Sequence, residues 1–308
     1  MSNNSFLPEI TVIIRTYNRV DKLKKAIESV IEQTFSNFEL IIIDNYSIDS
    51  TEELIANYDD KRIRYFKYKN NGVISASLNF GLEKSRGRYI AILDSDDFWY
   101  RDKLKISLEA LEKGFDFVYH DLKVNYSKKF NIFKSHIARS RRLGNNLYTD
   151  LLINGNGINN SSVVIRKDIL DKIGGFYQNN YIIGASDYMT WLCLSKATQK
   201  FQRINQILGC ISIDSSNMSS CNLQINELPR IREAFQEELN RIGIRHPFWI
   251  ARSLSRSFFE LGLYRKGLSE IANYLRTSFR YSDTPRIIYL VVINFFFFIR
   301  NILLNTKN

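Results

Sequence analysis

Three carboxylates, Asp94, Asp96 and Asp97, stand within four residues, directly after the apolar run 89–93. Like charges at that spacing repel one another, so a positively charged group has to lie among them. Magnesium and manganese ions prefer oxygen ligands and are often held by one or two carboxylates together with substrate phosphates. Open α/β sheets bind ligands outside the carboxyl ends of their strands. The cluster therefore indicates a metal–diphosphate site, and the alternative is an acidic turn that begins the next helix.

Apolar runs that alternate with helical patterns must position this cluster. Buried strands are predicted at 10–14, 40–43, 63–68, 89–93 and 117–120. Helices are predicted between them at 23–31, from the capping-box pattern 50–53 onward, at 73–85 and at 103–113. Strands separated by helices imply right-handed crossovers and a mainly parallel sheet. The sequence therefore predicts the α/β class.

The pattern is less regular in the second half of the chain. Residues 121–160 are basic and then rich in Asn and Gly, which predicts a loop or a mobile lid. Regular structure is predicted again as strands at 161–165 and within 204–213, and as helices at 167–173 and 188–197. After about residue 222 the chain is predicted to be helical. We therefore expect a domain over 1–222 and a helical region over 223–308.

Composition limits the function classes. The chain has 308 residues, 44% hydrophobic and 13% aromatic, enough for a full core. With 43 basic and 32 acidic residues its net charge is +11, which suits a phosphate-rich partner. Nucleic acid is disfavoured as that partner, because neither a basic stripe interleaved with aromatics nor a helix-turn-helix pattern occurs. The three cysteines are scattered along the chain, which favours a reducing compartment. The three histidines are also scattered, which argues against a zinc site. Residues 1–8 are too polar to form a signal peptide.

The tail contains an apolar run at 287–299 that is interrupted by Asn294 and followed by Arg300. It is shorter than the roughly 20 apolar residues that a membrane-spanning helix needs. A helix in the membrane interface, next to Arg280, Arg286 and Arg300, is one interpretation. A helix packed on the domain, or a contact between subunits, is the other. A true span is less favoured.

Polar residues follow three of the predicted strands. They lie at 15–19, at 44–50 and in the acidic cluster at 94–97. Each segment alone is a weak signal, because turn residues commonly follow strands. In a parallel sheet, however, the three segments would converge at one edge, which makes the combination much more specific.

These segments resemble the family 2 glycosyltransferases over roughly residues 8–215. The matching motifs are 11–19, 38–51, 71–72, 79–81 and 87–97. The resemblance implies the GT-A fold, a Rossmann-like and mainly parallel sheet flanked by helices, here with a C-terminal helical extension. It also implies an inverting enzyme that moves a sugar from a nucleotide-diphosphate donor to a glycan or lipid-linked acceptor in cell-surface polysaccharide synthesis.

The resemblance assigns roles to individual residues of the donor site. Thr16, Tyr17 and Asp44 would hold the base, with Asn45 beside them. Asn79 would hydrogen-bond near the diphosphate, or else stabilise a turn. The residues expected to hold Mn²⁺ or Mg²⁺ are Asp94, Asp96 and Asp97, and Asp96 would also contact the ribose.

The resemblance also supplies a candidate for the catalytic base. The family has an acidic residue at the start of a downstream helix that faces the sugar, and segment 184–191 matches it through Asp187. A carboxylate there could accept the proton of the acceptor hydroxyl. The alternative role of Asp187 is to cap the helix.

Three departures from the family pattern affect these expectations. Arg15 stands where Pro or Thr is usual, so the first loop could differ. Asn45 replaces a frequent Asp that often contacts uracil, so the donor could be a dTDP- or other nucleotide-sugar. The expected donor is therefore a UDP- or a dTDP-sugar. Ser212 and Asp214 stand where Arg and His are usual, which removes a positive contact to the diphosphate. A basic residue of 128–142 could replace that contact, although a solvated charged loop is the favoured interpretation.

Two other functions remain open at this point. A sugar nucleotidyltransferase has a related sheet and a metal site, but it would need a Gly-rich loop after the first strand, and Arg15-Thr16-Tyr17-Asn18 has no glycine. A non-catalytic membrane-associated assembly protein could use the same fold. For the transferase, the basic helical tail predicts peripheral membrane contact, with the enzyme cytoplasmic at the inner face of the membrane.

Overall fold

The structure is a computed structural model that describes residues 7–126, 136–213 and 221–278, and the positions 284–285, 287–288, 290–292 and 294. The chain forms two compact units. The first comprises Met1–Leu143, Gly157–Asn180 and Ser186–Ser216. The second comprises Gly144–Asn156, Tyr181–Ala185 and Asn217–Asn308. The predicted boundary after residue 222 stays a prediction.

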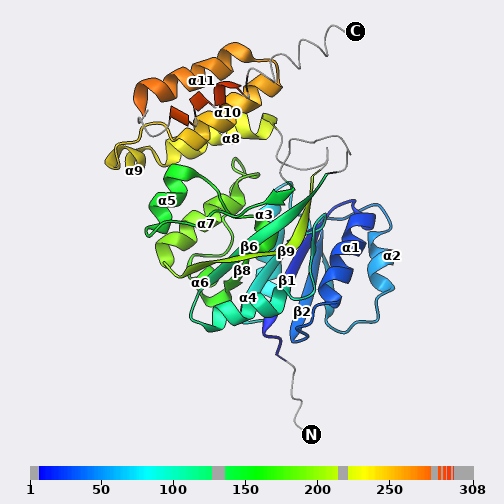
Figure 1. The fold of residues 1–308 in the computed structure, drawn as a ribbon. Coiled ribbons are helices and arrows are strands. Elements are labelled where there is room, and N and C mark those ends of the chain that lie inside the picture. Colours follow the sequence, from blue (N-terminus) through cyan, green and yellow to red (C-terminus); the bar gives the residue numbers. More distant parts are fainter. Residues whose placement is uncertain are drawn as a thin grey trace. The chain divides into compact units, whose positions relative to one another are not determined.

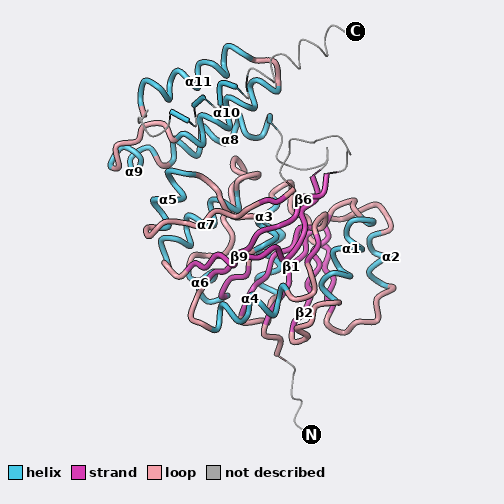
Figure 2. Tube along the Cα trace, in the orientation of Figure 1, coloured by secondary structure: helices cyan, strands magenta, loops and turns pink. Residues whose placement is uncertain are grey.

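A nine-stranded sheet runs through the first unit (Figures 1 and 2). Its order is β3-β2-β1-β4-β8-β6-β9-β5, and β7 pairs with β6. The strands are β1 (Ile10–Thr16), β2 (Phe38–Asp44), β3 (Ile63–Lys67), β4 (Tyr89–Asp94), β5 (Phe98–Trp99), β6 (Phe117–Tyr126), β7 (Ile137–Ala138), β8 (Val164–Arg166) and β9 (Phe201–Ile213). The long pairings, β1 with β2 and β4, β2 with β3, and β6 with β9, are parallel, which confirms the predicted α/β class.

Helices flank this sheet. They are α1 (Val20–Ile31), α2 (Thr51–Ala56), α3 (Ile74–Lys84), α4 (Lys103–Glu112), the 3₁₀ turn η1 (Asn160–Ser162), α6 (Lys167–Lys172) and α7 (Ser186–Ala197). In α1 the residues Leu23, Ala26, Ile27 and Val30 recur at helical spacing, and all four are fully buried. Burying each of the large aliphatic side chains contributes about 1.5–3 kcal/mol, so this face fixes α1 on the sheet.

The parallel register brings the three polar strand ends to one edge. Thr16 pairs with Asp44 across β1 and β2. Arg15 pairs with Asp94 across β1 and β4. The apolar interiors of β1, β2 and β4 are buried on both faces of the sheet. A slip of one residue would disturb this packing and move the polar strand ends out of line. The expected convergence of these segments is therefore a consequence of the buried strands behind them.

The prediction of a loop over 121–160 is wrong for much of that stretch. Strand β6 continues to Tyr126 because Leu122 and Val124 alternate inward and β9 pairs along its length. Strand β7 and helix α5 (Leu147–Asn154) follow. The predicted strands within 204–213 form one strand, β9, with a register shift beside His120. Residues 127–135 lie outside the described part, and with them Lys128, Lys129 and Lys134.

The second unit is helical, as predicted for the chain after residue 222. Its helices are α5, α8 (Cys221–Ala234), α9 (Gln236–Arg241), α10 (Phe248–Glu260) and α11 (Tyr264–Thr277). Its core includes Leu151, Leu228, Ile231, Leu254 and Ile271, all buried. Helix α5 belongs to this core through Trp249, whose indole N–H donates to the Leu152 carbonyl at 3.1 Å.

Part of the apolar tail can be placed. Leu290 and Asn294 are buried, and the Asn294 amide donates to Ser255 Oγ of α10 at 2.8 Å. Ile288, Val291 and Val292 are exposed. The rest of 287–299 lies outside the described residues. In the part of the chain that the structure describes, no helix has both the length and the apolar character that crossing a bilayer requires.

Candidate functional site

The acidic cluster at the end of β4 is paired with Arg15 of β1 and with Arg19 of the loop between β1 and α1. Asp94 Oδ1 accepts from Arg15 Nη2 at 2.6 Å, and Asp96 Oδ2 accepts from Arg19 Nη1 at 2.8 Å. The Asn160 amide of η1 also donates to Asp94, at 3.1 Å. These contacts supply part of the positive charge that the spacing of the carboxylates demands.

The third carboxylate, Asp97, is buried and hydrogen-bonded to neutral donors. Its Oδ2 accepts from the Ser161 hydroxyl at 2.6 Å, and its Oδ1 accepts from the Ser212 backbone N–H at 3.0 Å. Burial raises the pKa of Asp97 well above its usual range, and the charge of Asp94 adds to the increase. The same two causes, burial first, raise the pKa of Asp96. Two arginines thus face three carboxylates, one of which, Asp97, has neutral hydrogen-bond donors as partners.

The arrangement of these carboxylates bears on the expected metal. Within residues 7–126, 136–213 and 221–278, no group of three His, Cys, Asp or Glu side chains is arranged to hold a metal ion. Asp94 and Asp96 each already contact an arginine. Magnesium and manganese sites in nucleotide-binding proteins need only one or two carboxylates, because phosphates and water complete the coordination. Asp94, Asp96 and Asp97 supply the carboxylate oxygens that such a half-site uses, so the chemistry of the donor set fits it.

The predicted base pocket lies at the adjoining ends of β1 and β2. The Asn45 backbone N–H donates to the Thr16 carbonyl at 3.0 Å. Asp44 is buried, and its Oδ1 accepts from the backbone N–H and the hydroxyl of Ser47 at 2.9 and 2.6 Å. Its Oδ2 accepts from the Tyr65 hydroxyl at 2.7 Å. Burial is the main cause that raises the pKa of Tyr65, and the hydrogen bond to Asp44 is the second. The Tyr65 hydroxyl therefore keeps its proton and donates it to this bond.

The loops after β1 and β2 are tied to each other. Asn18 donates its backbone N–H to Ser47 Oγ at 2.9 Å and accepts the Ile48 N–H at 2.8 Å. Asn18 and Tyr46 have φ angles of 49° and 59°, a region that costs a residue with a side chain about 1–2 kcal/mol. The cross-loop bonds hold these conformations. They leave the rings of Tyr17 and Tyr46 more than half exposed beside the buried Asp44.

Asn79 uses its side chain to hold a turn. Its Oδ1 accepts the Phe176 N–H at 2.8 Å, and its Nδ2 donates to the Phe176 carbonyl at 2.9 Å. A Cβ on the neighbouring Gly175, where φ is 91°, would lie 2.6 Å from Asn79 Oδ1. Asn79 thus makes the contacts expected of a residue that stabilises a turn, the alternative to a bond near the diphosphate. The same contacts join α3 to the segment after α6.

Asp187 occupies the first turn of α7 and is partly buried. Its Oδ1 accepts the Tyr188 N–H at 2.6 Å. The helix is fixed farther along, because Thr190 Oγ1 donates to the Ser186 carbonyl and accepts the Tyr177 N–H. Trp191 is fully buried, edge-on to Phe117 with the ring centroids 5.0 Å apart. The packed body of α7 thus presents Asp187 at its amino end.

Sequence reasoning missed four residues that hold the predicted carboxylates. Ser47 and Tyr65 hold Asp44, while Asn160 and Ser161 hold Asp94 and Asp97. The run Asn159-Asn160-Ser161-Ser162 before a short strand was the available signal for η1. Asp214 and the first half of the basic stretch 128–142 lie outside the described residues.

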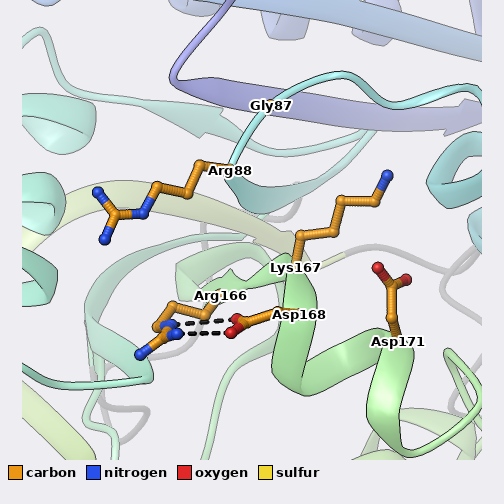
Figure 3. A pocket seen from close by; sticks show the side chains of 6 residues that line it. All are labelled: Gly87, Arg88, Arg166, Lys167, Asp168 and Asp171. Carbon is orange, nitrogen blue, oxygen red and sulfur yellow. Dashed lines mark hydrogen bonds and ion pairs between the residues drawn. The ribbon is translucent and has the colours of Figure 1, made fainter.

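A separate pocket of about 370 Å³ is lined by Gly87, Arg88, Arg166, Lys167, Asp168 and Asp171 (Figure 3). It lies where β4 begins and β8 ends, away from the polar strand ends. Arg166 pairs with Asp168 and with Asp116, and Lys167 donates to the Ser85 carbonyl. Its cations are already paired, so this hollow is not the candidate site.

Comparisons with known proteins agree with the geometry. The family model described as "Glycosyl transferase family 2" matches residues 11–174. A protein of Rickettsia felis named "Uncharacterized glycosyltransferase" is 48% identical over 107 residues, 34% of this chain but only 18% of that protein. The chain therefore matches less than a fifth of that relative's length.

Two further proteins match most of the chain. The Escherichia coli protein named "UDP-Glc:alpha-D-GlcNAc-diphosphoundecaprenol beta-1,3-glucosyltransferase WfgD" is 26% identical over 222 residues, 72% of this chain and 83% of that protein. The crystal structure of Staphylococcus aureus TarS 1-349 in complex with UDP superposes with a TM-score of 0.56 at 15% identity, covering 92% of this chain and 78% of the other. This likeness confirms the expected GT-A fold.

Proposed function

Because the chain belongs to glycosyltransferase family 2, we propose that it is an inverting transferase that moves a sugar from a nucleotide-diphosphate donor to a glycan or lipid-linked acceptor in cell-surface polysaccharide synthesis. One observation carries the proposal. The register pairs Thr16 with Asp44 across β1 and β2 and Arg15 with Asp94 across β1 and β4, which supports adjacent subsites for a base and for a diphosphate. A nucleoside diphosphate has its base at one end and its charge at the other, so it suits two adjacent subsites of this kind.

The base subsite suits a pyrimidine nucleotide. Tyr17 offers an exposed ring on which a base can stack, and Asp44 is held by Ser47 and Tyr65 as an acceptor for a base N–H. The buried Thr16 Oγ1 has no hydrogen-bond partner among the described residues, so it can bond to the ligand. Asn45 leaves UDP- and dTDP-sugars as alternatives, and the UDP-Glc in the name of the E. coli relative favours UDP.

The acidic cluster would hold the diphosphate end through Mn²⁺ or Mg²⁺. Asp96 and Asp97 are the proposed metal and ribose ligands, with Asp94 as the third carboxylate. When bound, a divalent cation neutralises charge that develops on the leaving diphosphate. Arg15 and Arg19 fix the orientation of Asp94 and Asp96 before any ligand arrives. Ser161 holds Asp97 in the same way.

On the acceptor side, Asp187 is the proposed general base. Its carboxylate would accept the proton of the acceptor hydroxyl as that oxygen attacks the anomeric carbon from the face opposite the leaving diphosphate. One displacement of this kind inverts the configuration of the sugar. The local bond to the Tyr188 N–H engages Oδ1 and orients the carboxyl group.

A lipid-linked acceptor would bring the enzyme to the cytoplasmic face of a membrane. The name of the E. coli relative specifies a diphosphoundecaprenol acceptor. In the second unit, Leu268 and Leu275 of α11 are exposed, as are Ile288, Val291 and Val292. Exposed apolar side chains on a chain of net charge +11 support peripheral contact with an anionic bilayer.

Nucleotide binding and turnover test the proposal separately. A thermal-shift screen of nucleoside diphosphates, with and without manganese, should show the largest stabilisation for UDP or dTDP plus the metal, because a ligand that binds the folded state stabilises it. Asp187→Asn should abolish transfer while donor still binds, and retained turnover would exclude Asp187 as the base. Release of pyrophosphate from a sugar phosphate and a nucleoside triphosphate would instead identify a nucleotidyltransferase. Failure to cleave any nucleotide-sugar with manganese would favour an assembly protein.

A further inference from the structure

The short turn η1 holds the acidic cluster through two side chains and one carbonyl. The Asn160 amide donates to Asp94 Oδ1 and Oδ2 at 3.1 and 3.3 Å. The Ser161 hydroxyl donates to Asp97 Oδ2 at 2.6 Å and accepts the backbone N–H of Asp94 at 3.1 Å. The Ser161 carbonyl accepts the indole N–H of Trp99, just after the cluster, at 2.6 Å. The position of this turn therefore sets the position of the carboxylates.

Asn159, the residue before the turn, is fixed by its side chain. Its Nδ2 donates to the Ala138 carbonyl and to Ser140 Oγ, each at 3.1 Å. The Ser140 hydroxyl itself donates to the His120 carbonyl at 2.7 Å, so it meets Asn159 with a lone pair. Both partners of the amide are thus acceptors. They use its two hydrogens and fix its orientation.

The partners of Asn159 are anchored in turn. Ser140 is buried and donates its backbone N–H to Asp121 Oδ1 at 2.9 Å. Asp121 of β6, also buried, accepts from Arg203 Nη2 of β9 at 2.6 Å. Buried polar networks of this kind make their surroundings rigid. All of these residues belong to the first unit, as does the acidic cluster.

The backbone of Asn159 begins the turn. Its carbonyl accepts the N–H of Ser162 at 3.0 Å and the hydroxyl of the same residue at 2.6 Å. Ser162 is fully buried, and β8 starts two residues later between β4 and β6. The turn is thus bound to Asn159 at one end and to the sheet at the other. Asn159 acts on the carboxylates through this turn.

We propose that Asn159 is a positioning residue for the acidic cluster, which sets turn η1 so that Asp94 and Asp97 are in place for the donor diphosphate and its cation. The inference rests on the proposed role of the cluster. Asn159 touches no reacting atom. Its contribution is geometric, because ligating groups must be held within about 0.5 Å of their productive positions. Loss of a residue that supports metal ligands typically costs on the order of 10- to 100-fold in metal affinity.

Asn159→Asp tests the proposal. The carboxylate keeps the size of the side chain, but it has no hydrogen to donate and places an oxygen against the Ala138 carbonyl. We expect the gain in UDP affinity that manganese brings to fall on the order of 10-fold, measured by isothermal titration calorimetry. The UDP affinity without metal should stay within about twofold, because Thr16 and Asp44 are unchanged. Amide hydrogen exchange in a peptide covering 90–99, without any ligand, should become faster.

The matched control is Asn125→Asp, the same change at an exposed position of β6. It should leave the manganese effect and the exchange unchanged. Asn159→Ala removes the two donated hydrogen bonds without adding a charge, and it should show the same losses as Asn159→Asp. If Asn159→Asp does not fold, Ser140→Ala carries the test, since it removes one acceptor of Asn159 and keeps the backbone bond to Asp121.

Three outcomes would overturn the proposal. They are a wild-type manganese effect in Asn159→Asp, wild-type exchange in 90–99, or a loss of metal-free UDP affinity as large as the loss of the manganese effect. A wild-type protein whose UDP affinity does not respond to manganese would instead refute the proposed metal subsite. The exchange in 90–99 would then decide by itself whether Asn159 positions the cluster.

Discussion

Arg15 and Asp94 occupy paired positions on β1 and β4, and their side chains form an ion pair of 2.6 Å. Arg15 departs from the usual residue of the family at this position, and Asp94 is its partner in the structure. A cation supplied by the neighbouring strand allows three carboxylates to stand together at the end of β4.

Replacing Arg15 with Met should therefore destabilise the protein. Asp94 would lose its partner beside Asp97, at a cost of about 1 kcal/mol after allowance for partial exposure. The melting temperature should fall by a few degrees without divalent cation, and manganese should restore part of it. Differential scanning fluorimetry with and without manganese measures both effects. The control is Arg88→Met, which removes an exposed pair with Glu9 of 3.6 Å. The prediction would be contradicted if the two variants had the same melting temperature and the same response to manganese.

Asp97→Asn should make the protein more stable and less active. The amide oxygen can accept the Ser212 N–H, and the NH₂ can donate to Ser161, whose hydroxyl rotates to accept it. Because the pKa of Asp97 is raised in the folded state, the folded protein holds this proton to a higher pH than the unfolded chain does. Its ionisation therefore lowers stability as pH rises above the ordinary value of 3.8.

The gain from Asp97→Asn should accordingly be small near pH 4 and reach about 1–2 kcal/mol above the raised pKa. Urea unfolding at pH 4.5 and pH 8 measures it, and a transfer assay should show at least a 100-fold loss. A variant that is less stable than the wild type at pH 8 would show that the charged form of Asp97 is the stabilising one.

Lys103→Met should also stabilise the fold. Lys103 is fully buried on α4, with Nζ 3.6 Å from the centroid of the Trp99 ring and no hydrogen-bond partner among the described residues. Burial lowers its pKa well below 10.5, so the folded state releases this proton at a lower pH than the unfolded state, and wild-type stability rises with pH toward 10.5. Methionine fills similar space without a charge.

We expect Lys103→Met to gain about 1–3 kcal/mol at pH 7 and to reduce the increase in stability between pH 7 and pH 9.5. Denaturant melts at the two pH values provide the measurement. The control is Lys105→Met, at an exposed position of the same helix. It should change neither the stability at pH 7 nor the increase in stability between the two pH values. His120 is affected as well, because burial and then the charge of Lys103 lower its pKa to about 3. Its pKa should rise in the variant.

Tyr65→Phe tests the support of the base pocket. It removes the hydroxyl that donates to Asp44 Oδ2, a bond to a charged acceptor worth about 1.5–3 kcal/mol. If part of that energy orients Asp44 for the nucleotide, UDP should bind about 5- to 20-fold more weakly. Isothermal titration calorimetry checks this. Tyr58→Phe removes a hydroxyl without a hydrogen-bond partner among the described residues, so it should leave binding unchanged.

The strand ends were predictable because each combines a buried apolar run with polar residues immediately after it. Parallel pairing then brings Thr16, Asp44 and Asp94 together without further information. The contribution of Ser161 was not predictable, since it depends on β8 inserting antiparallel between β4 and β6, which no local pattern specifies. Helix α5 does have a local signal in the sequence, because Asn146 is its N-cap and its side-chain oxygen accepts the Thr149 N–H.

The second unit is built from three separate stretches of chain, Gly144–Asn156, Tyr181–Ala185 and Asn217–Asn308. During synthesis the first two leave the ribosome long before the helices that complete their core. Until α10 emerges, α5 lacks a helix that it contacts in the folded unit. Until α8 emerges, the backbone N–H groups of 183–185 lack the Glu227 carboxylate that accepts them. Such late, distant pairing slows folding and exposes apolar surface to aggregation. We therefore expect a shortened protein that ends before α8 to aggregate more readily than the full chain, because α5 and segment 183–185 would lack these partners.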